Sequence, residues 1–234
     1  MPIKKISLNV KSRTVVIIIL SIIIADQALK FWVKTHMLYQ EQIPLIGSWF
    51  RLFFIENEGM AWGWKFGGEW GKMALTLFRL VAVIFGVFYI RSTIKKKMHP
   101  GFIACAALIF AGALGNLIDS LFYGMIFSSS DLGMPLATAF PHGGGYAGFL
   151  HGRVVDMLYA PIIEDKVLPH WLPVWGGERF TFFSPIFNIA DASISVGVIL
   201  LLLFQKRFFK KNPREKPGPN LEADTPVNDT VRAL

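Results

Sequence analysis

Two aspartates in the second half of the chain have the residue type and setting for acid–base chemistry. Asp191 lies inside the apolar run Ile186–Phe204, three residues after Asn188, and Asp156 lies in an apolar segment upstream. An ionised side chain inside a membrane span costs about 2.5–3.5 kcal/mol, so Asp191 needs a partner. Two carboxyl groups held close together cannot both ionise and therefore share a proton. Such a pair can activate water with one member and protonate a carbonyl oxygen or leaving amine with the other.

Other catalytic groups are scarce. Cys105 is the one cysteine, which excludes an internal disulfide and a multi-cysteine metal site. It lies in an apolar run, where a small buried residue fits better than a reactive thiol. The sequence has no histidine pair with metal-ligand spacing and no glycine-rich phosphate loop. We therefore expect neither a metal ion nor another cofactor.

The composition is that of an integral membrane protein. Hydrophobic residues make up 53% of the 234 residues and charged residues only 17%, which is unusual for a soluble domain. The formal charge of +8 would suggest nucleic acid in a soluble protein. Here Lys and Arg lie beside the ends of the apolar runs, where they fix membrane orientation. We expect membrane lipid, and no nucleic acid, as a partner.

The apolar runs predict four transmembrane helices in one membrane domain covering residues 1–211. The expected helices span about residues 15–33, 73–90, 102–122 and 186–204. The first run follows a basic start, as a secretory signal would, but its length and internal charges favour a retained helix.

The segments between and after these helices complete the expected fold. Residues 49–55 read as a strand. Residues 212–234, rich in Pro, Asn and acidic side chains, are expected to form a disordered cytoplasmic tail. The predicted fold class is a mainly α membrane protein, with four transmembrane helices and a small extracytoplasmic cap that contains β-structure and loops.

Charge distribution sets the expected topology. Basic residues cluster before the first helix, at residues 91–97 and at residues 206–211, whereas the two remaining loops are near neutral or acidic. The positive-inside bias therefore places both termini in the cytoplasm of a multi-pass protein.

With this topology, polar residues of three helices fall at one depth. Asp26 and Asp191 each lie about 10 Å below the outer end of their helix, and Asn116 and Asp119 occupy the last two turns of the third. Asp26 and Lys30 are four residues apart and can pair on one face. We expect these groups to converge in the outer third of the bilayer.

Five short blocks occur in a fixed order between residues 26 and 191. They are Asp26-Gln27-Ala28-Leu29-Lys30, Asn57-Glu58-Gly59-Met60-Ala61-Trp62-Gly63, Gly112-Ala113-Leu114-Gly115-Asn116-Leu117-Ile118-Asp119, Gly152-Arg153-Val154-Val155-Asp156 and Phe187-Asn188-Ile189-Ala190-Asp191. In this order they resemble the lipoprotein signal peptidases, the type II signal peptidase family of membrane aspartyl endopeptidases.

The resemblance implies that Asp156 and Asp191 are the catalytic dyad. It also implies supporting or substrate-binding roles for Asp26, Lys30, Asn57, Gly59, Asn116, Asp119, Asn188 and Ala190. The implied enzyme removes the signal peptide from diacylglyceryl-modified prolipoproteins, cleaving before the lipidated cysteine without a cofactor. It would act in the bacterial cytoplasmic (inner) membrane with its active site near the outer face. We expect a monomer.

The chain departs from the family pattern at Ser120, where the family usually has Arg directly after the aspartate of the third block. Arg153 is the substitute that we considered as the partner of Asp119. The stretches on either side of Asp156 are also longer than expected for the family.

Two other functional classes are compatible with intramembrane carboxylates. A proton-coupled carrier would use Asp26, Lys30, Asp119 and Asp191 as an ion path, and it predicts polar residues that continue to the cytoplasmic end. A non-enzymatic scaffold gives no reason for several carboxylates at one depth.

Overall fold

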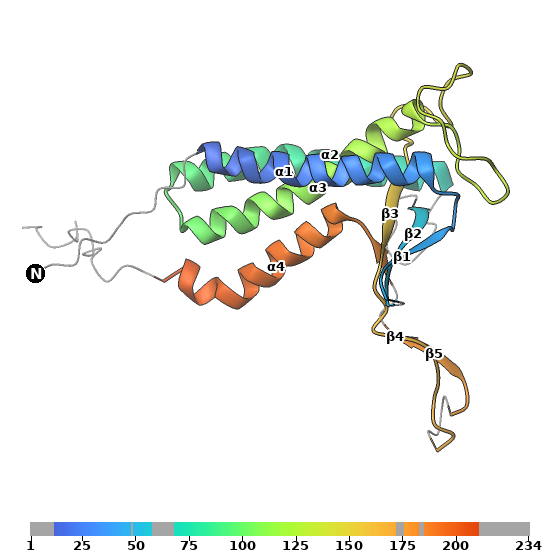
Figure 1. Cartoon of the computed structure of the whole chain (residues 1–234). Coiled ribbons are helices and arrows are strands. Elements are labelled where there is room, and N and C mark those ends of the chain that lie inside the picture. The colour runs from blue at the N-terminus through green and yellow to red at the C-terminus, as the bar shows by residue number, and fades with distance from the viewer. Residues whose placement is uncertain (1–11, 48, 58–67, 172–175, 183–184, 211–234) are drawn as a thin grey trace, which may run out of the picture.

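Four long helices lie side by side, and a small sheet covers one end of the bundle (Figure 1). The computed structural model describes residues 12–47, 49–57, 68–171, 176–182 and 185–210. The helices are α1 (Ser12–His36), α2 (Gly68–Lys95), α3 (Pro100–Ile126) and α4 (Ile189–Phe208). Each is long and apolar enough to cross a membrane. The predicted fold class is therefore confirmed; the expected tail at residues 212–234 lies outside the described residues.

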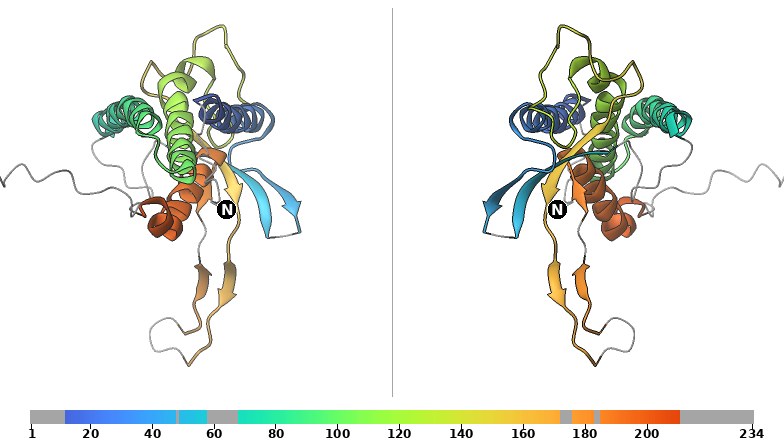
Figure 2. Two further views of the ribbon diagram at one scale, coloured as in Figure 1. Left: turned by 90° about the vertical axis from the view of Figure 1, so that its left-hand side faces the viewer. Right: turned by 90° about the vertical axis from the view of Figure 1, so that its right-hand side faces the viewer.

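Helix α3 is the centre of the bundle and packs against the other three helices (Figure 2). It begins at Pro100, whose missing N–H costs nothing at a helix start, and the side chain of His99 accepts a hydrogen bond from Gly101 N at 3.1 Å. Small residues let α4 approach closely. A Cβ atom on Gly112 would lie 2.2 Å from the carbonyl oxygen of Ala190. Such close backbone approach through glycine is typical of packed membrane helices.

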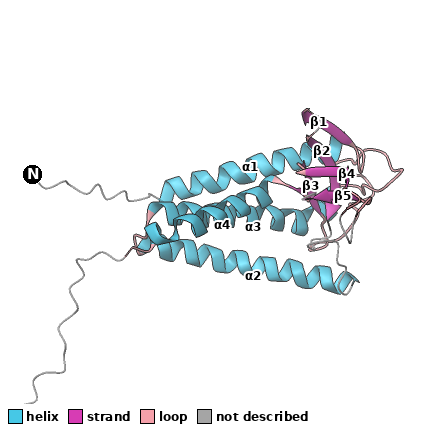
Figure 3. Ribbon diagram, turned by 90° about the horizontal axis from the view of Figure 1, so that it is seen from below, coloured by secondary structure: helices cyan, strands magenta, loops and turns pink. Residues whose placement is uncertain are grey.

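The sheet at the covered end joins segments that lie far apart in the sequence. Its strands run in the order β1 (Gln42–Ile46), β2 (Phe50–Asn57), β3 (Val154–Tyr159) and β6 (Ile186–Phe187), and every neighbouring pair is antiparallel. Figure 3 shows the strands gathered at this end, which we call the capped end. The predicted strand at residues 49–55 corresponds to β2.

A second, two-stranded sheet forms a hairpin that projects away from the bundle (Figures 1 and 2). Its strands are β4 (Ile163–Val167) and β5 (Arg179–Phe182), which pair antiparallel. The hairpin lies in the chain between β3 and β6 and therefore connects them.

Strand β3 is buried over nearly its whole length. Its side chains point alternately to the two faces of the sheet, which differ in their surroundings. Val155 and Met157 are fully buried in an apolar cluster with Phe54 of β2 and Phe127 after α3. Successive side chains of a strand point to opposite faces, so Asp156 faces away from this cluster. Its neighbours therefore differ from those of the apolar residues on either side.

The fourth helix differs from its expected range. The sequence predicts a helix from residue 186, but Ile186 and Phe187 form β6 and pair with Tyr159 and Leu158 of β3. The helix begins after Asn188, whose extended backbone and side chain cap its first turn. Apolar residues that continue into a buried strand cannot be distinguished from a helix by hydropathy, which explains the difference. The other three helices extend beyond their expected ranges.

The close approach of α3 and α4 gives the first testable expectation. We expect Gly112→Ala to lower the free energy of unfolding by about 1–3 kcal/mol, because the new methyl group must displace backbone of α4. The midpoint of thermal unfolding in detergent measures this effect. Gly143→Ala is the matched control, since nothing lies within 4 Å of a Cβ atom at that exposed loop position. Equal midpoints for the two variants would contradict this packing.

Candidate active site

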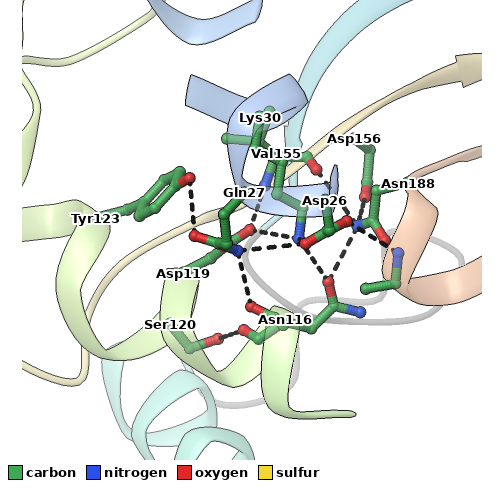
Figure 4. Close-up of polar contacts among 12 residues, drawn as sticks. Asp26, Gln27, Lys30, Asn116, Asp119, Ser120, Tyr123, Val155, Asp156 and Asn188 are labelled. Atoms are coloured by element: carbon green, nitrogen blue, oxygen red, sulfur yellow. Dashed lines mark hydrogen bonds and ion pairs between the residues drawn. The ribbon is translucent and has the colours of Figure 1, made fainter. Parts of the chain in front are cut away.

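The side chain of Asn188 joins the two aspartates. Its Nδ2 donates a hydrogen bond to Asp156 Oδ1 at 2.7 Å, and its Oδ1 accepts one from the backbone N–H of Asp191 at 2.8 Å. Figure 4 shows Asn188 beside Asp156. The position of Asn188 follows from the fold, because β6 pairs with β3 and Asn188 then caps α4. One amide thus contacts the strand that carries one acid and the helix that carries the other.

The environment of Asp156 favours its protonated form. The residue is 3% exposed, and this burial, followed by the negative charge of Asp191, raises the pKa of Asp156 to about 7. The positive charge of Lys30 and the hydrogen bond from Asn188 oppose this rise. Near neutral pH, Asp156 can therefore hold a proton that an exposed aspartate would have lost.

Asn116 of α3 positions the second aspartate. Its Nδ2 donates to Asp191 Oδ1 at 2.7 Å, while its Oδ1 accepts from Lys30 Nζ at 2.9 Å and from Asn188 Nδ2 at 3.0 Å. Because two donors converge on Oδ1, the amide orientation is determined, and its NH₂ group must face Asp191. Asn116 therefore connects Asp191 to Asn188 and to the buried cation.

That cation, Lys30, lies between two carboxylates. Its Nζ is 2.9 Å from Asp26 Oδ2 and 2.9 Å from Asp119 Oδ2, and the three side chains are 0% exposed. An ammonium group has three N–H donors, and these go to Asp26, Asp119 and Asn116. The expected pairing of Asp26 with Lys30 is present, and Lys30 is also the partner of Asp119.

The two carboxylates of this cluster hold the backbone beside each aspartate of the pair. Asp26 Oδ1 accepts from Ala190 N at 2.9 Å, and Asp119 Oδ2 accepts from Val155 N at 3.2 Å. Ala190 precedes Asp191 and Val155 precedes Asp156. The buried ion cluster thus fixes both acids through the residue before each of them.

The expectation that Arg153 partners Asp119 is wrong. Arg153 Nη1 lies 3.4 Å from Glu56 Oε2 and 3.3 Å from Asp131 Oδ1. Glu56 is buried and also pairs with Lys34 of α1. Arg153 lies just before β3 in the chain, and its side chain points to β2 and to the loop after α3. Asp119 pairs with Lys30.

The remaining predicted residues lie in or near the second block. Asn57 ends β2 opposite Val154, so it lies on the strand beside Asp156. Gly59 falls outside the described residues. Among the described residues, no group of His, Cys, Asp or Glu is arranged to hold a metal ion.

The sequence reasoning missed several polar residues of the site. Gln27 Nε2 donates to Asp119 Oδ1 at 2.8 Å, and Tyr123 OH donates to Gln27 Oε1 at 3.2 Å (Figure 4). Arg79 of α2 donates from Nη1 to Ser120 Oγ at 3.0 Å. The signal for Arg79 was present, because it is the one charged residue in the apolar stretch 73–90.

Comparison with known proteins decides the family. The family model for signal peptidase (SPase) II matches residues 18–207, which is most of the chain. The chain belongs to the signal peptidase II family. It is therefore an aspartic peptidase of the membrane, and the acid pair at Asn188 is the candidate for its catalytic groups.

Curated relatives agree with this assignment, and a solved structure shares the fold. The lipoprotein signal peptidase of Porphyromonas gingivalis is 46% identical over 198 residues, covering 84% of this chain and 84% of the relative. That of Amoebophilus asiaticus is 36% identical over 215 residues, covering 91% and 85%. A bacterial membrane enzyme solved by the in meso method at 2.3 Å resolution has a TM-score of 0.54 and 24% identity, covering 88% of this chain and 95% of the other. This last likeness concerns the fold.

The signal peptidase should depend on Lys30 for its stability. We expect Lys30→Met to lower the free energy of unfolding by about 3–5 kcal/mol, because two buried carboxylates lose their cation. Thermal unfolding in detergent checks this, with Lys95→Met at the exposed end of α2 as the control. An unfolding midpoint equal to that of the control would show that the cluster is not held by this charge.

Proposed function

We propose that this signal peptidase cleaves prolipoproteins that are diacylated on cysteine, before that cysteine, with Asp156 and Asp191 as its catalytic dyad. The observation that carries the proposal is the shared contact of Asn188, which brings a buried carboxyl group on β3 to the first turn of α4. The names of the relatives, lipoprotein signal peptidases, support the choice of substrate.

The proposed reaction uses water held between the two acids. Asp191 takes a proton from water, the water oxygen bonds to the scissile carbonyl carbon, and protonated Asp156 donates its proton to the carbonyl oxygen. The carbon–nitrogen bond then breaks as Asp191 returns a proton to the leaving amine of the lipidated cysteine. The proton of the new hydroxyl group returns to Asp156. The raised pKa of Asp156 supports its role as the acid.

The orientation follows from the charges of the chain. The end of the bundle opposite the cap carries the basic segments at residues 91–97 and 206–210, so we place that end and both termini in the cytoplasm. The capped end then faces outward. Along the bundle, α4 begins farther from the sheet than the capped ends of α1 and α2 (Figure 1). Because Asp191 is in the first turn of α4, we place it within the membrane near its outer surface.

This depth suits a lipidated substrate. The diacylglyceryl chains would remain in lipid while the signal peptide approaches the dyad from within the membrane.

The carrier hypothesis is less well supported. At the cytoplasmic half of the bundle the described buried core is apolar, with Val15, Ile90, Ile103, Ala106 and Ala107 in contact. The charged side chains that are buried in the described residues lie toward the capped end: Asp26, Lys30, Lys34, Glu56, Asp119 and Asp156. An ion path would need polar groups through the apolar half as well.

The dyad is tested by isosteric substitution. We expect Asp156→Asn and Asp191→Asn each to lower the cleavage rate of a synthetic diacylated peptide by at least about 100-fold, because neither amide can transfer the required proton. Gel analysis of the peptide in detergent measures cleavage, and membrane insertion should be retained. Asp165→Asn, in the projecting hairpin, is the matched control and should keep full activity. Substantial cleavage by either dyad variant would refute the assignment.

The pH dependence follows from the pKa of Asp156. Because that pKa is raised to about 7, the protonated acid is present below this pH and is lost above it. We therefore expect kcat/KM to fall by about tenfold per pH unit well above pH 7. The folded protein retains a proton that the unfolded chain releases between about pH 4 and 7, so this group also makes the fold less stable as pH rises through that window. An activity profile that stays flat from pH 6 to about 9 would contradict Asp156 as the acid.

A further inference from the structure

Arg79 places a positive charge in the middle of a membrane span. It is the one charged residue between Met73 and Ile90 of α2. Its neighbours Phe78 and Val81 are 69% and 64% exposed on the lipid side of the helix, whereas Arg79 is partly buried. A guanidinium at this depth is expensive, and such residues face the bundle interior and mark functional sites.

The guanidinium lies on the side of α3 that faces the acid pair. Its Nη1 donates to Ser120 Oγ at 3.0 Å, and that hydroxyl donates to the backbone oxygen of Asn116 at 3.0 Å. The negative charges of Asp191, Asp119 and Asp156 all lie near enough to attract the guanidinium. Ser120, the residue that follows Asp119, thus orients Arg79 toward the acid pair.

Asp26 and Asp119 do not need this arginine, because they already share a cation. Lys30 lies between Asp26 and Asp119 and donates to both of them and to Asn116. Lys30 belongs to α1 and is fully buried, whereas Arg79 belongs to α2 and is partly exposed. A planar guanidinium with five N–H donors suits a ligand that presents several oxygen atoms.

On the proposed function, the substrate supplies such oxygen atoms. A signal peptide that crosses the membrane as a helix ends near the scissile bond, and its last four carbonyl groups have no partner within the helix. They form the negative end of the helix dipole, and lipid offers no water to satisfy them. A fixed cation at the same depth would complement them.

We propose that Arg79 binds the unpaired backbone carbonyl oxygens at the carboxyl end of the signal-peptide helix, next to the acid pair. This inference rests on the proposed function and adds a substrate-binding residue to it. Ser120 serves to position the guanidinium. By holding the end of the helix, Arg79 determines which peptide bond reaches the two aspartates.

The first test separates binding from chemistry. The full chain is assayed in detergent with a synthetic diacylated peptide, comparing wild type with Arg79→Gln and Arg79→Lys. We expect Arg79→Gln to raise KM by about tenfold or more, as the loss of a hydrogen bond to a charged group predicts, with kcat changed by less than about threefold. The KM of Arg79→Lys should lie between those of wild type and Arg79→Gln, because lysine keeps the charge but lacks the planar guanidinium group.

A matched control and a stability measurement exclude a general defect. Arg91→Gln removes the same charge from the exposed cytoplasmic end of α2 and should leave KM unchanged. The thermal unfolding midpoint of Arg79→Gln should stay close to that of wild type. A wild-type KM for Arg79→Gln, or a fall in kcat and unfolding midpoint at unchanged KM, would overturn the proposal.

An exchange of the two contacting residues gives a second test. The double variant Arg79→Ser with Ser120→Arg moves the guanidinium from α2 to α3, and we expect its KM to fall below that of Arg79→Gln. A KM that remains at the Arg79→Gln value would show that α2 itself, and not the guanidinium, is required, which would overturn the proposal.

If wild type fails to cleave the diacylated peptide, the proposed function fails and this inference falls with it. If wild type cleaves and the Arg79 variants match it, only this inference fails.

Discussion

The ammonium group of Lys30 is the interaction on which the arrangement of the site depends. It pairs with a carboxylate of its own helix and with one from α3, and further hydrogen bonds of those carboxylates hold the backbone beside Asp191 and Asp156. Burial of three charged groups is unfavourable unless each is paired and hydrogen-bonded, and here each is. Removing Lys30 therefore leaves two buried carboxylates without a cation, and removing Asp26 or Asp119 releases a backbone contact beside the acid pair.

This cluster also explains why the acids can come from elements of different kinds. Asp156 lies on a strand and Asp191 in the first turn of a helix, and their backbones are held by α1 and α3. Asn188 and Asn116 complete the network with amide groups, which stay neutral whatever the protonation state of the two acids. The geometry can therefore persist while the charge of the pair changes.

Much of this could be predicted from the sequence because the strongest signals are one-dimensional. Hydropathy gives the helices, the bias of Lys and Arg gives an orientation, and the rise per residue places Asp26, Asn116 and Asp191 at similar depths. The order of the five blocks brings Asp156 into the same site, although its own segment is ordinary.

What the sequence could not give is the rotation of each element about its own axis. Depth alone does not show that Arg79 turns toward Ser120, or that Arg153 faces Glu56 instead of Asp119. The packing of α2 on α3 decides the partner of Arg79, and the pairing of β2 with β3 decides that of Arg153. The formation of β6 in place of another helical turn at residues 186–187 is likewise decided by pairing with β3. These choices depend on segments more than a hundred residues apart in some cases, which no local pattern records.

The pairing of β3 with β6 has an evolutionary consequence. Leu158 and Phe187 are paired in the sheet, so the end of β3 and the start of β6 are held together whatever the length of the chain between them. The projecting hairpin lies between these two paired strands in the chain, and lengthening a loop whose ends are already joined costs little entropy. Insertions and deletions between residues 160 and 185 can therefore accumulate among species without displacing either acid, and this part of the chain is free to diverge while the reaction is preserved.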